Sequence, residues 1–141
     1  MTNQSENQAE RAESVILIAE LRNFTRMSEM LEPARVLGLA DQFFECAAQA
    51  MAKNGGLSMA VHNDSLVAVF RGAATRELAR AAVRAAQQLF GEFDAIVQAW
   101  EREYGLRTAI ALGMHRGEAV FGEAGPAAQR NAVVFGDCVS I

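Results

Sequence analysis

Cysteine and long apolar runs are both scarce in this chain. Two cysteines, Cys46 and Cys138, lie far apart in the 141 residues, which excludes the close cysteine pairs of zinc-binding motifs. We expect both to be ordinary buried thiols in a reducing compartment. No apolar run approaches the roughly 20 residues that span a bilayer, and residues 1–11 are polar. The sequence therefore predicts a cytoplasmic protein without a membrane segment or signal peptide.

A surplus of positive charge is also missing. The chain has 13 Lys and Arg against 17 Asp and Glu, for a net charge of −4 at pH 7. Its one lysine is Lys53, and its arginines are scattered. A basic footprint for nucleic acid is thus absent, and we expect no nucleic-acid partner. The hydrophobic content of 51% is ordinary for a globular domain, and the length fits one domain with a real core.

The apolar spacing predicts two long helices. Residues 32–53 place apolar side chains three and four positions apart, with Pro33 in the first turn. Residues 75–103 repeat this pattern, although Gly91 allows a bend or a break. Residues 1–13 are rich in Asn, Gln and Glu and predict a disordered tail.

Short apolar runs predict the strands. Residues 15–19 are continuously apolar, as in a strand buried on both faces, and residues 21–26 read as a loop. Residues 57–61 and 66–70 predict a hairpin whose turn contains Asn63 and Asp64.

The C-terminal part predicts three more strands. Residues 107–114 and 119–121 read as a hairpin around residues 115–118, and residues 133–135 as a short last strand. The element order indicates an α+β sandwich of ferredoxin-like type, a mainly antiparallel sheet with helices on one face. We expect one domain over residues 14–141, incomplete at its C-terminus because residues 137–141 read as the start of an unfinished element.

Two acidic residues stand in strand-end positions. Glu20 ends the first apolar run, and Asp64 lies in the hairpin turn. Carboxylates at the ends of adjacent strands can hold a divalent metal against a phosphate chain. The alternative is a solvated strand end and an aspartate that favours turns.

Four stretches resemble motifs of the class III adenylate/guanylate cyclase family. Residues 18–25 resemble its first metal motif, F-A-D-I-x-G-F-T, and residues 55–70 its hairpin G-G-x-x-x-K-x-x-G-D-x-x-x-A-V-F. Residues 113–122 resemble G-I-H-x-G-x-x-x-x-G, and residues 134–140 more weakly resemble the segment before the final catalytic helix. The resemblance runs from about Val15 to Ile141 and implies a nucleotidyl cyclase-like fold.

The resemblance implies a site for two divalent metals, Mg or Mn. In the family, two aspartates bind them, and the metals activate the ribose 3′-hydroxyl for attack on the α-phosphate. Glu20 stands at the first aspartate, Leu21 follows it, and Asp64 matches the second. Glu is still an oxygen ligand, but its extra methylene moves the carboxylate by about 1 Å, and such a misplacement can cost about 100-fold in rate.

The resemblance also implies a phosphate loop at Asn23, Phe24 and Thr25, where Asn23 replaces a glycine and its side chain crowds close backbone approach. Arg22 and Arg26 beside it either contact an anion or are solvated.

The family positions that read the nucleotide are altered. Ala60 stands at the base-reading lysine, Val133 at its partner position and Ser140 at the asparagine that orients the ribose. The transition-state arginine, four residues after Ser140, falls beyond Ile141. The resemblance therefore implies that no catalytic set is intact in this chain. His62 and His115 are expected to be structural or surface residues rather than ligands.

Two functional hypotheses remain open. The first is a degenerate cyclase-like domain that acts as a regulatory or dimerisation module in signalling, since family domains pair head to tail as homodimers or with a cyclase-like partner. The second is an active or weakly active cyclase that uses ATP or GTP, with the chain truncated or completed by a partner subunit. A weaker third option is a sensor of another nucleotide or anion.

Overall fold

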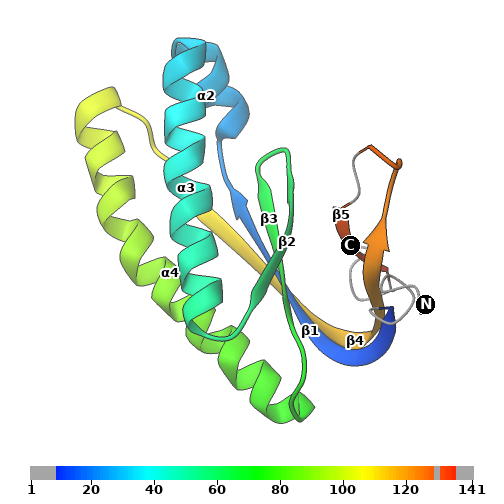
Figure 1. Cartoon of the computed structure of the whole chain (residues 1–141). Coiled ribbons are helices and arrows are strands. Elements are labelled where there is room, and N and C mark those ends of the chain that lie inside the picture. Colours follow the sequence, from blue (N-terminus) through cyan, green and yellow to red (C-terminus); the bar gives the residue numbers. More distant parts are fainter. Residues whose placement is uncertain (1–8, 129–130, 136–141) are drawn as a thin grey trace.

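The computed structural model describes residues 9–128 and 131–135. Its core is a five-stranded antiparallel sheet with the order β2-β3-β1-β4-β5, and the helices cover one face of that sheet (Figure 1). The predicted α+β architecture is confirmed. The elements are β1 (Glu10–Leu21), α2 (Phe24–Met30), α3 (Pro33–Lys53), β2 (Leu57–His62), β3 (Ser65–Phe70), α4 (Thr75–Tyr104), β4 (Ile110–Ala124) and β5 (Asn131–Phe135).

Both predicted long helices are present. Helix α3 begins at Pro33, whose missing N–H is harmless in a first turn. Helix α4 is continuous through Gly91, so the break that this glycine would allow does not occur. It ends at Gly105, which has φ 66° and donates its backbone N–H to the Glu101 carbonyl. Glycine occupies this left-handed cap because it has no Cβ to clash.

Aromatic side chains join the two long helices. The Phe43 and Phe93 rings meet edge to face at 5.6 Å, and Phe93 meets Trp100 in the same way at 5.6 Å. All three are buried. The Trp100 indole N–H donates a 2.8 Å hydrogen bond to the Gln42 Oε1, so its polar atom is satisfied. This cluster therefore joins α3 to α4.

Strand β1 is buried on both faces, as its apolar run predicted. Val15, Leu17 and Ala19 belong to the core beneath the helices, whereas Ile16 belongs to a smaller cluster on the opposite face. The strand is longer than expected, because residues 10–13, assigned to the tail, pair with residues 118–121 of β4. Residues 1–8 of that predicted tail lie outside the described residues.

The predicted hairpin around residues 115–118 is wrong. Strand β4 runs without a turn from Ile110 to Ala124 and pairs with β1 over residues 110–121. Ser14 of β1 lies opposite Gly117, and its hydroxyl donates a 3.0 Å hydrogen bond to the Gly117 carbonyl. The polar, glycine-containing segment is therefore extended because β1 supplies a continuous partner. By contrast, the predicted β2–β3 hairpin and the last strand are confirmed.

A short helix occupies part of the predicted loop at residues 21–26. Helix α2 begins at Phe24, and its Met27 side chain is fully buried in the main core. Seven residues are too few to show a clear helical period, so packing of Met27 decides the conformation.

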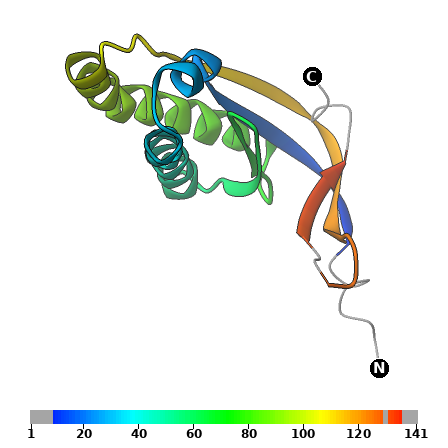
Figure 2. The ribbon, with the colours of Figure 1, turned by 90° about the horizontal axis from the view of Figure 1, so that it is seen from above.

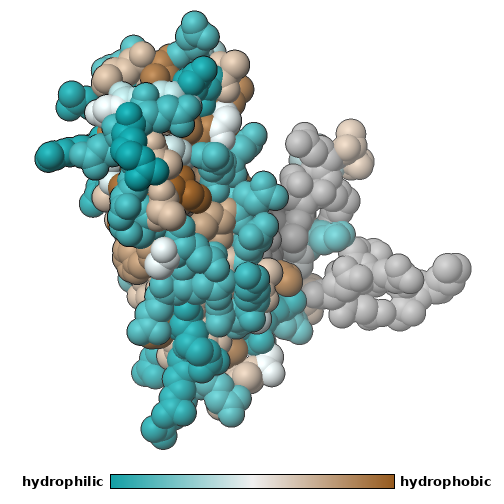
Figure 3. Space-filling view, turned by 90° about the vertical axis from the view of Figure 1, so that its left-hand side faces the viewer, coloured by the Kyte–Doolittle hydropathy of each residue, from teal (hydrophilic) through white to brown (hydrophobic). Residues whose placement is uncertain are grey.

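The sheet is strongly bent. Seen from above, the helices lie to one side, and the paired β1–β4 arm curves away from them toward β5 (Figure 2). The outer side of the helix layer is mainly hydrophilic, with separate small hydrophobic areas (Figure 3). Among the described residues, none of the helices is long and apolar enough to cross a membrane.

A glycine pair provides a matched test of this packing. A Cβ at Gly56 would lie 2.6 Å from the buried Phe70 ring, whereas one at Gly91 would meet nothing within 4 Å. We expect Gly56→Ala to lower the free energy of unfolding by about 1–3 kcal/mol, and Gly91→Ala to raise it by about 1 kcal/mol. Urea unfolding followed by the emission of the single tryptophan, Trp100, measures both. Equal effects would contradict the packing.

The Cys46 thiol gives a second test. Burial, and then the charge of Glu92, raise the pKa of Cys46 above its ordinary value, so less of the reactive thiolate is present near neutral pH. In a Cys138→Ser background, the pH profile of alkylation should give an apparent pKa above that of an unperturbed cysteine. Glu92→Gln should lower that pKa, and an unchanged profile would show that Glu92 has no influence.

Candidate functional site

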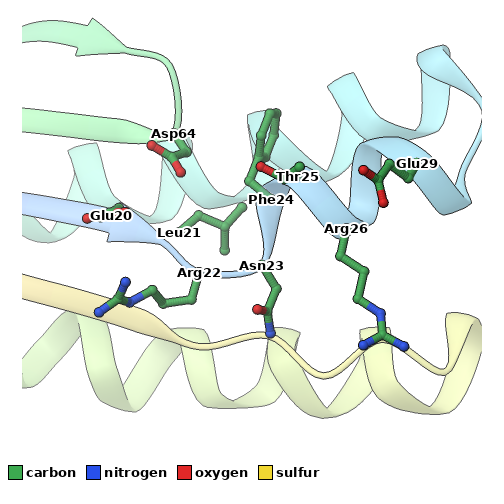
Figure 4. A pocket seen from close by; sticks show the side chains of 9 residues that line it. All are labelled: Glu20, Leu21, Arg22, Asn23, Phe24, Thr25, Arg26, Glu29 and Asp64. Atoms are coloured by element: carbon green, nitrogen blue, oxygen red, sulfur yellow. The ribbon is translucent and has the colours of Figure 1, made fainter.

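A cleft lies where β1 ends, beside the tip of the β2–β3 hairpin and the start of α2 (Figure 4). Its volume is about 640 Å³. Most of its lining is polar or charged, which suits a hydrophilic ligand more than an apolar one. The lining residues are Glu20, Leu21, Arg22, Asn23, Phe24, Thr25, Arg26, Glu29 and Asp64.

Backbone hydrogen bonds hold the hairpin tip against the strand end. The Leu21 N–H donates to the Asp64 carbonyl at 2.9 Å, one step beyond the register pair of Glu20 with Ser65. Glu20 and Asp64 are both half-buried, and their side chains occupy the same end of the cleft (Figure 4). The two carboxylates that the sequence singled out are thus brought together.

Asn23 shapes the loop between β1 and α2. Its backbone is left-handed, with φ 63°, a region that asparagine tolerates better than most residues. Its side-chain Nδ2 donates a 2.7 Å hydrogen bond to the Arg107 carbonyl. The side chain is therefore anchored toward the segment that follows α4, as Figure 4 shows. A glycine would adopt this backbone equally well but would lack the anchor.

Charges of both signs face the cleft. Arg22 and Arg26 contribute two positive charges, and Glu20, Glu29 and Asp64 contribute three negative ones. No ion pair within the described ranges joins these five side chains. Arg22 and Arg26 are exposed, and Arg26 also lines an adjoining cleft of about 380 Å³ with Arg107. Both guanidinium groups are free to contact an anion.

The donor set suits a metal that is shared with a ligand. In the part of the chain that the structure describes, no group of three His, Cys, Asp or Glu side chains could hold a metal ion. Glu20 and Asp64 supply carboxylate oxygens from two elements, which hard divalent cations prefer. Mg²⁺ commonly takes one or two carboxylates and completes its shell with water and phosphate oxygens. The residues fit such a shared ion, not an all-protein cage.

The other predicted site residues are not among the described residues that line this cleft. Ala60 stands in β2 opposite Val67, and Val133 in β5 opposite Gly122. Ser140 lies outside the described residues. His62 and His115 are exposed and line no part of the cleft. The cleft as described thus contains the predicted metal and phosphate positions but not the predicted base-reading positions.

Sequence reasoning missed Glu29. This residue reaches the cleft from α2, the helix that was taken partly for a loop. Its spacing of three residues from Arg26 places both side chains on neighbouring positions of one helical face. A helical assignment from Phe24 onward would have revealed the pair.

Comparison with known proteins identifies this architecture. No protein-family model matches the chain. It is 28% identical over 127 residues to an adenylate cyclase of Anabaena cylindrica, covering 89% of this chain and 25% of that protein. It is 28% identical over 134 residues to adenylate cyclase 1 of Rhizobium meliloti (strain 1021), covering 93% and 20%. The chain thus spans a fifth to a quarter of the length of these curated relatives.

Solved structures give the same result. The adenylyl cyclase CyaB from P. aeruginosa superimposes with a TM-score of 0.85 at 20% identity, covering 94% of this chain and 69% of that one. The guanylyl cyclase Cya2 superimposes with a TM-score of 0.82 at 27% identity, covering 94% and 68%. The chain therefore has the fold of class III adenylyl/guanylyl cyclase domains and is similar in sequence to adenylate cyclases.

Proposed function

We propose that this domain is a degenerate class III cyclase that acts as a regulatory and dimerisation module in signalling and does not form a cyclic nucleotide. The single observation that carries this proposal is the contrast between the metal and phosphate positions, which keep polar residues, and the base-reading positions, which do not. The metal and phosphate positions line one cleft, whereas the positions that should read the base are Ala60 and Val133. Neither side chain can donate or accept a hydrogen bond.

Apolar residues at the base-reading positions have a consequence for the binding energy of a nucleotide. A triphosphate with its metal can still gain binding energy from Glu20, Asp64 and the loop that begins at Asn23. That energy is the same for every nucleoside triphosphate, because the base contributes no hydrogen bond to its recognition. Binding without selection suits a ligand-responsive or merely structural pocket better than an enzyme that must choose one substrate.

Glu20 further disfavours catalysis. A two-metal reaction requires ligands placed within a fraction of an ångström, and Mg²⁺ demands near-octahedral geometry. Glutamate in place of aspartate shifts the carboxylate by about 1 Å, which costs about 100-fold in rate where positioning is critical. Ser140 replaces the ribose-orienting asparagine, a further loss for the same step.

The alternative is an active or weakly active cyclase that converts ATP or GTP to a 3′,5′-cyclic nucleotide and diphosphate. In its favour, Glu20 and Asp64 line one cleft, and both are oxygen donors. This alternative needs a transition-state arginine that follows Ile141 or comes from a partner subunit. It also needs base contacts from residues other than Ala60 and Val133.

We accordingly propose that the domain works as a pair, either with a second copy or with a cyclase-like partner. As a pseudoenzyme it would regulate by occupying the partner position of an active domain. On this proposal residues 14–141 act as one unit, ATP or GTP is an optional ligand, and Mg or Mn is the ion that accompanies it.

Absence of turnover is the direct test. We expect the purified chain with Mn²⁺ and either ATP or GTP to form no cyclic nucleotide above the buffer background, measured by mass spectrometry. An active class III cyclase assayed in parallel controls for the conditions. Turnover that disappears in Asp64→Asn but persists in Asp41→Asn, an exposed α3 acid outside the cleft, would contradict the proposal and establish the alternative.

Nucleotide selectivity is the second test. Calorimetric titration with non-hydrolysable ATP and GTP analogues and excess Mn²⁺ should give weak binding with affinities within about threefold of each other, a difference of about 0.7 kcal/mol. Asp64→Asn should weaken binding of both analogues, whereas Asp41→Asn should leave it unchanged. A tenfold preference for one base would show that a base pocket persists. Absence of heat at millimolar analogue would contradict the metal role of Glu20 and Asp64.

A further inference from the structure

The cleft at the end of β1 adjoins a second cleft that the proposed function does not use. The second cleft has a volume of about 380 Å³ and lies between the start of α2 and the segment that follows α4. Asn23 and Arg26 line both clefts, so the two meet at these side chains. The residues that line only the second cleft are Glu101, Gly105, Leu106 and Arg107. The two clefts together form a groove that leads from Glu20 and Asp64 to Arg107.

The two ends of this groove carry opposite charge. The carboxylate end consists of Glu20 and Asp64, which lie together (Figure 4). The arginine end consists of Arg26 and Arg107. Figure 4 shows Arg26 extending from α2 toward the segment that follows α4, away from the two carboxylates. Among the described residues that line the arginine end, only Glu101 is negatively charged.

Both arginines of the arginine end are available to a ligand. Arg26 forms no ion pair or hydrogen bond with a residue in the described ranges. The Arg107 Nε lies 3.6 Å from the Glu101 Oε1, but these side chains are 89% and 52% exposed, and an ion pair so exposed contributes little. A guanidinium group binds a phosphate through two parallel hydrogen bonds. Arg107 can therefore exchange Glu101 for a phosphate group at small cost.

We propose that the groove binds a linear chain of phosphates longer than a triphosphate. A divalent cation joins the first phosphates to Glu20 and Asp64, and the terminal phosphates lie against Arg26 and Arg107. This inference rests on the proposed function for the carboxylate end, and it adds the chemical class of the ligand. The cation neutralises the phosphates at one end of the chain and the arginines neutralise those at the other, so one ligand satisfies both ends of the groove.

The charge pattern favours a phosphate chain over other anions. A single phosphate or carboxylate can occupy one end of the groove but cannot contact both. A nucleic-acid backbone requires a basic footprint, which a chain of net charge −4 with scattered arginines does not provide. Inorganic polyphosphate and a nucleoside 5′-tetraphosphate share the required chemistry. Because the base-reading positions are the apolar Ala60 and Val133, we expect the nucleoside to add little.

Calorimetric titration with preformed Mn²⁺ complexes tests the ligand class. We expect inorganic tetraphosphate to bind about tenfold more tightly than inorganic triphosphate, because the added phosphate reaches the arginine end. Adenosine 5′-tetraphosphate should bind within about threefold of the inorganic chain. Equal affinities for the three- and four-phosphate chains would overturn this proposal and leave the proposed function intact. Binding that requires the adenosine would also overturn it. Formation of a cyclic nucleotide would contradict the proposed function and leave the dependence on chain length untouched.

Side-chain variants test the arginine end itself. Arg107→Gln keeps the backbone carbonyl that anchors Asn23, so it should remove the gain from the fourth phosphate without weakening triphosphate binding. Glu101→Gln should strengthen tetraphosphate binding, because it removes the carboxylate that competes for Arg107. Arg102→Gln is the matched control, since Arg102 is an exposed arginine of α4 that lines neither cleft. A gain that persists in Arg107→Gln, or that Arg102→Gln removes equally, would overturn the proposal.

Discussion

The backbone pairing of β1 is the constraint on which the other features depend. The strand pairs with β3 along one edge and with β4 along the other, and both of its faces are buried. A slip of one residue would exchange the two sets of side chains, so its register is strongly fixed. That register places Glu20 opposite Ser65 and lets Leu21 bond to the Asp64 carbonyl. The position of the two carboxylates is thus a consequence of core packing.

Local patterns predicted the parts of the fold that local interactions decide. Helices α3 and α4, and the β2–β3 hairpin with its Asn63–Asp64 turn, were readable because their spacing and turn residues agree with their packing. The proximity of Glu20 and Asp64 followed from strand ends and motif order. Strand β4 was misread because Gly117 and its polar neighbours look like a turn, and only the distant partner Ser14 shows that they are extended. Helix α2, and the place of Glu29 on it, could not be predicted in this way. The helix depends on the burial of Met27, and seven residues are too few to show a helical period.

The site separates two tasks that an enzyme must perform together. On the proposed function, phosphate and metal recognition would rely on the backbone around Asn23 and on Glu20 and Asp64, whose positions follow from the pairing of β1 with β3. Base recognition relies on single polar side chains, which can be lost without cost to the core. Ala60 and Val133 stand at such positions. Degeneration of a cyclase-like domain is therefore expected to begin at the base and to leave the carboxylate end in place, and Asn23 keeps its loop conformation through the Arg107 carbonyl.

Arg107 links the cleft to the C-terminal end of α4. Its carbonyl accepts the hydrogen bond of the Asn23 side chain, and its guanidinium lies 3.6 Å from Glu101. Both charged groups are exposed, so the ion pair alone contributes little. Because the Asn23 side chain is bonded to this segment, a ligand that fixes the loop at Asn23 would also restrict the backbone that follows α4.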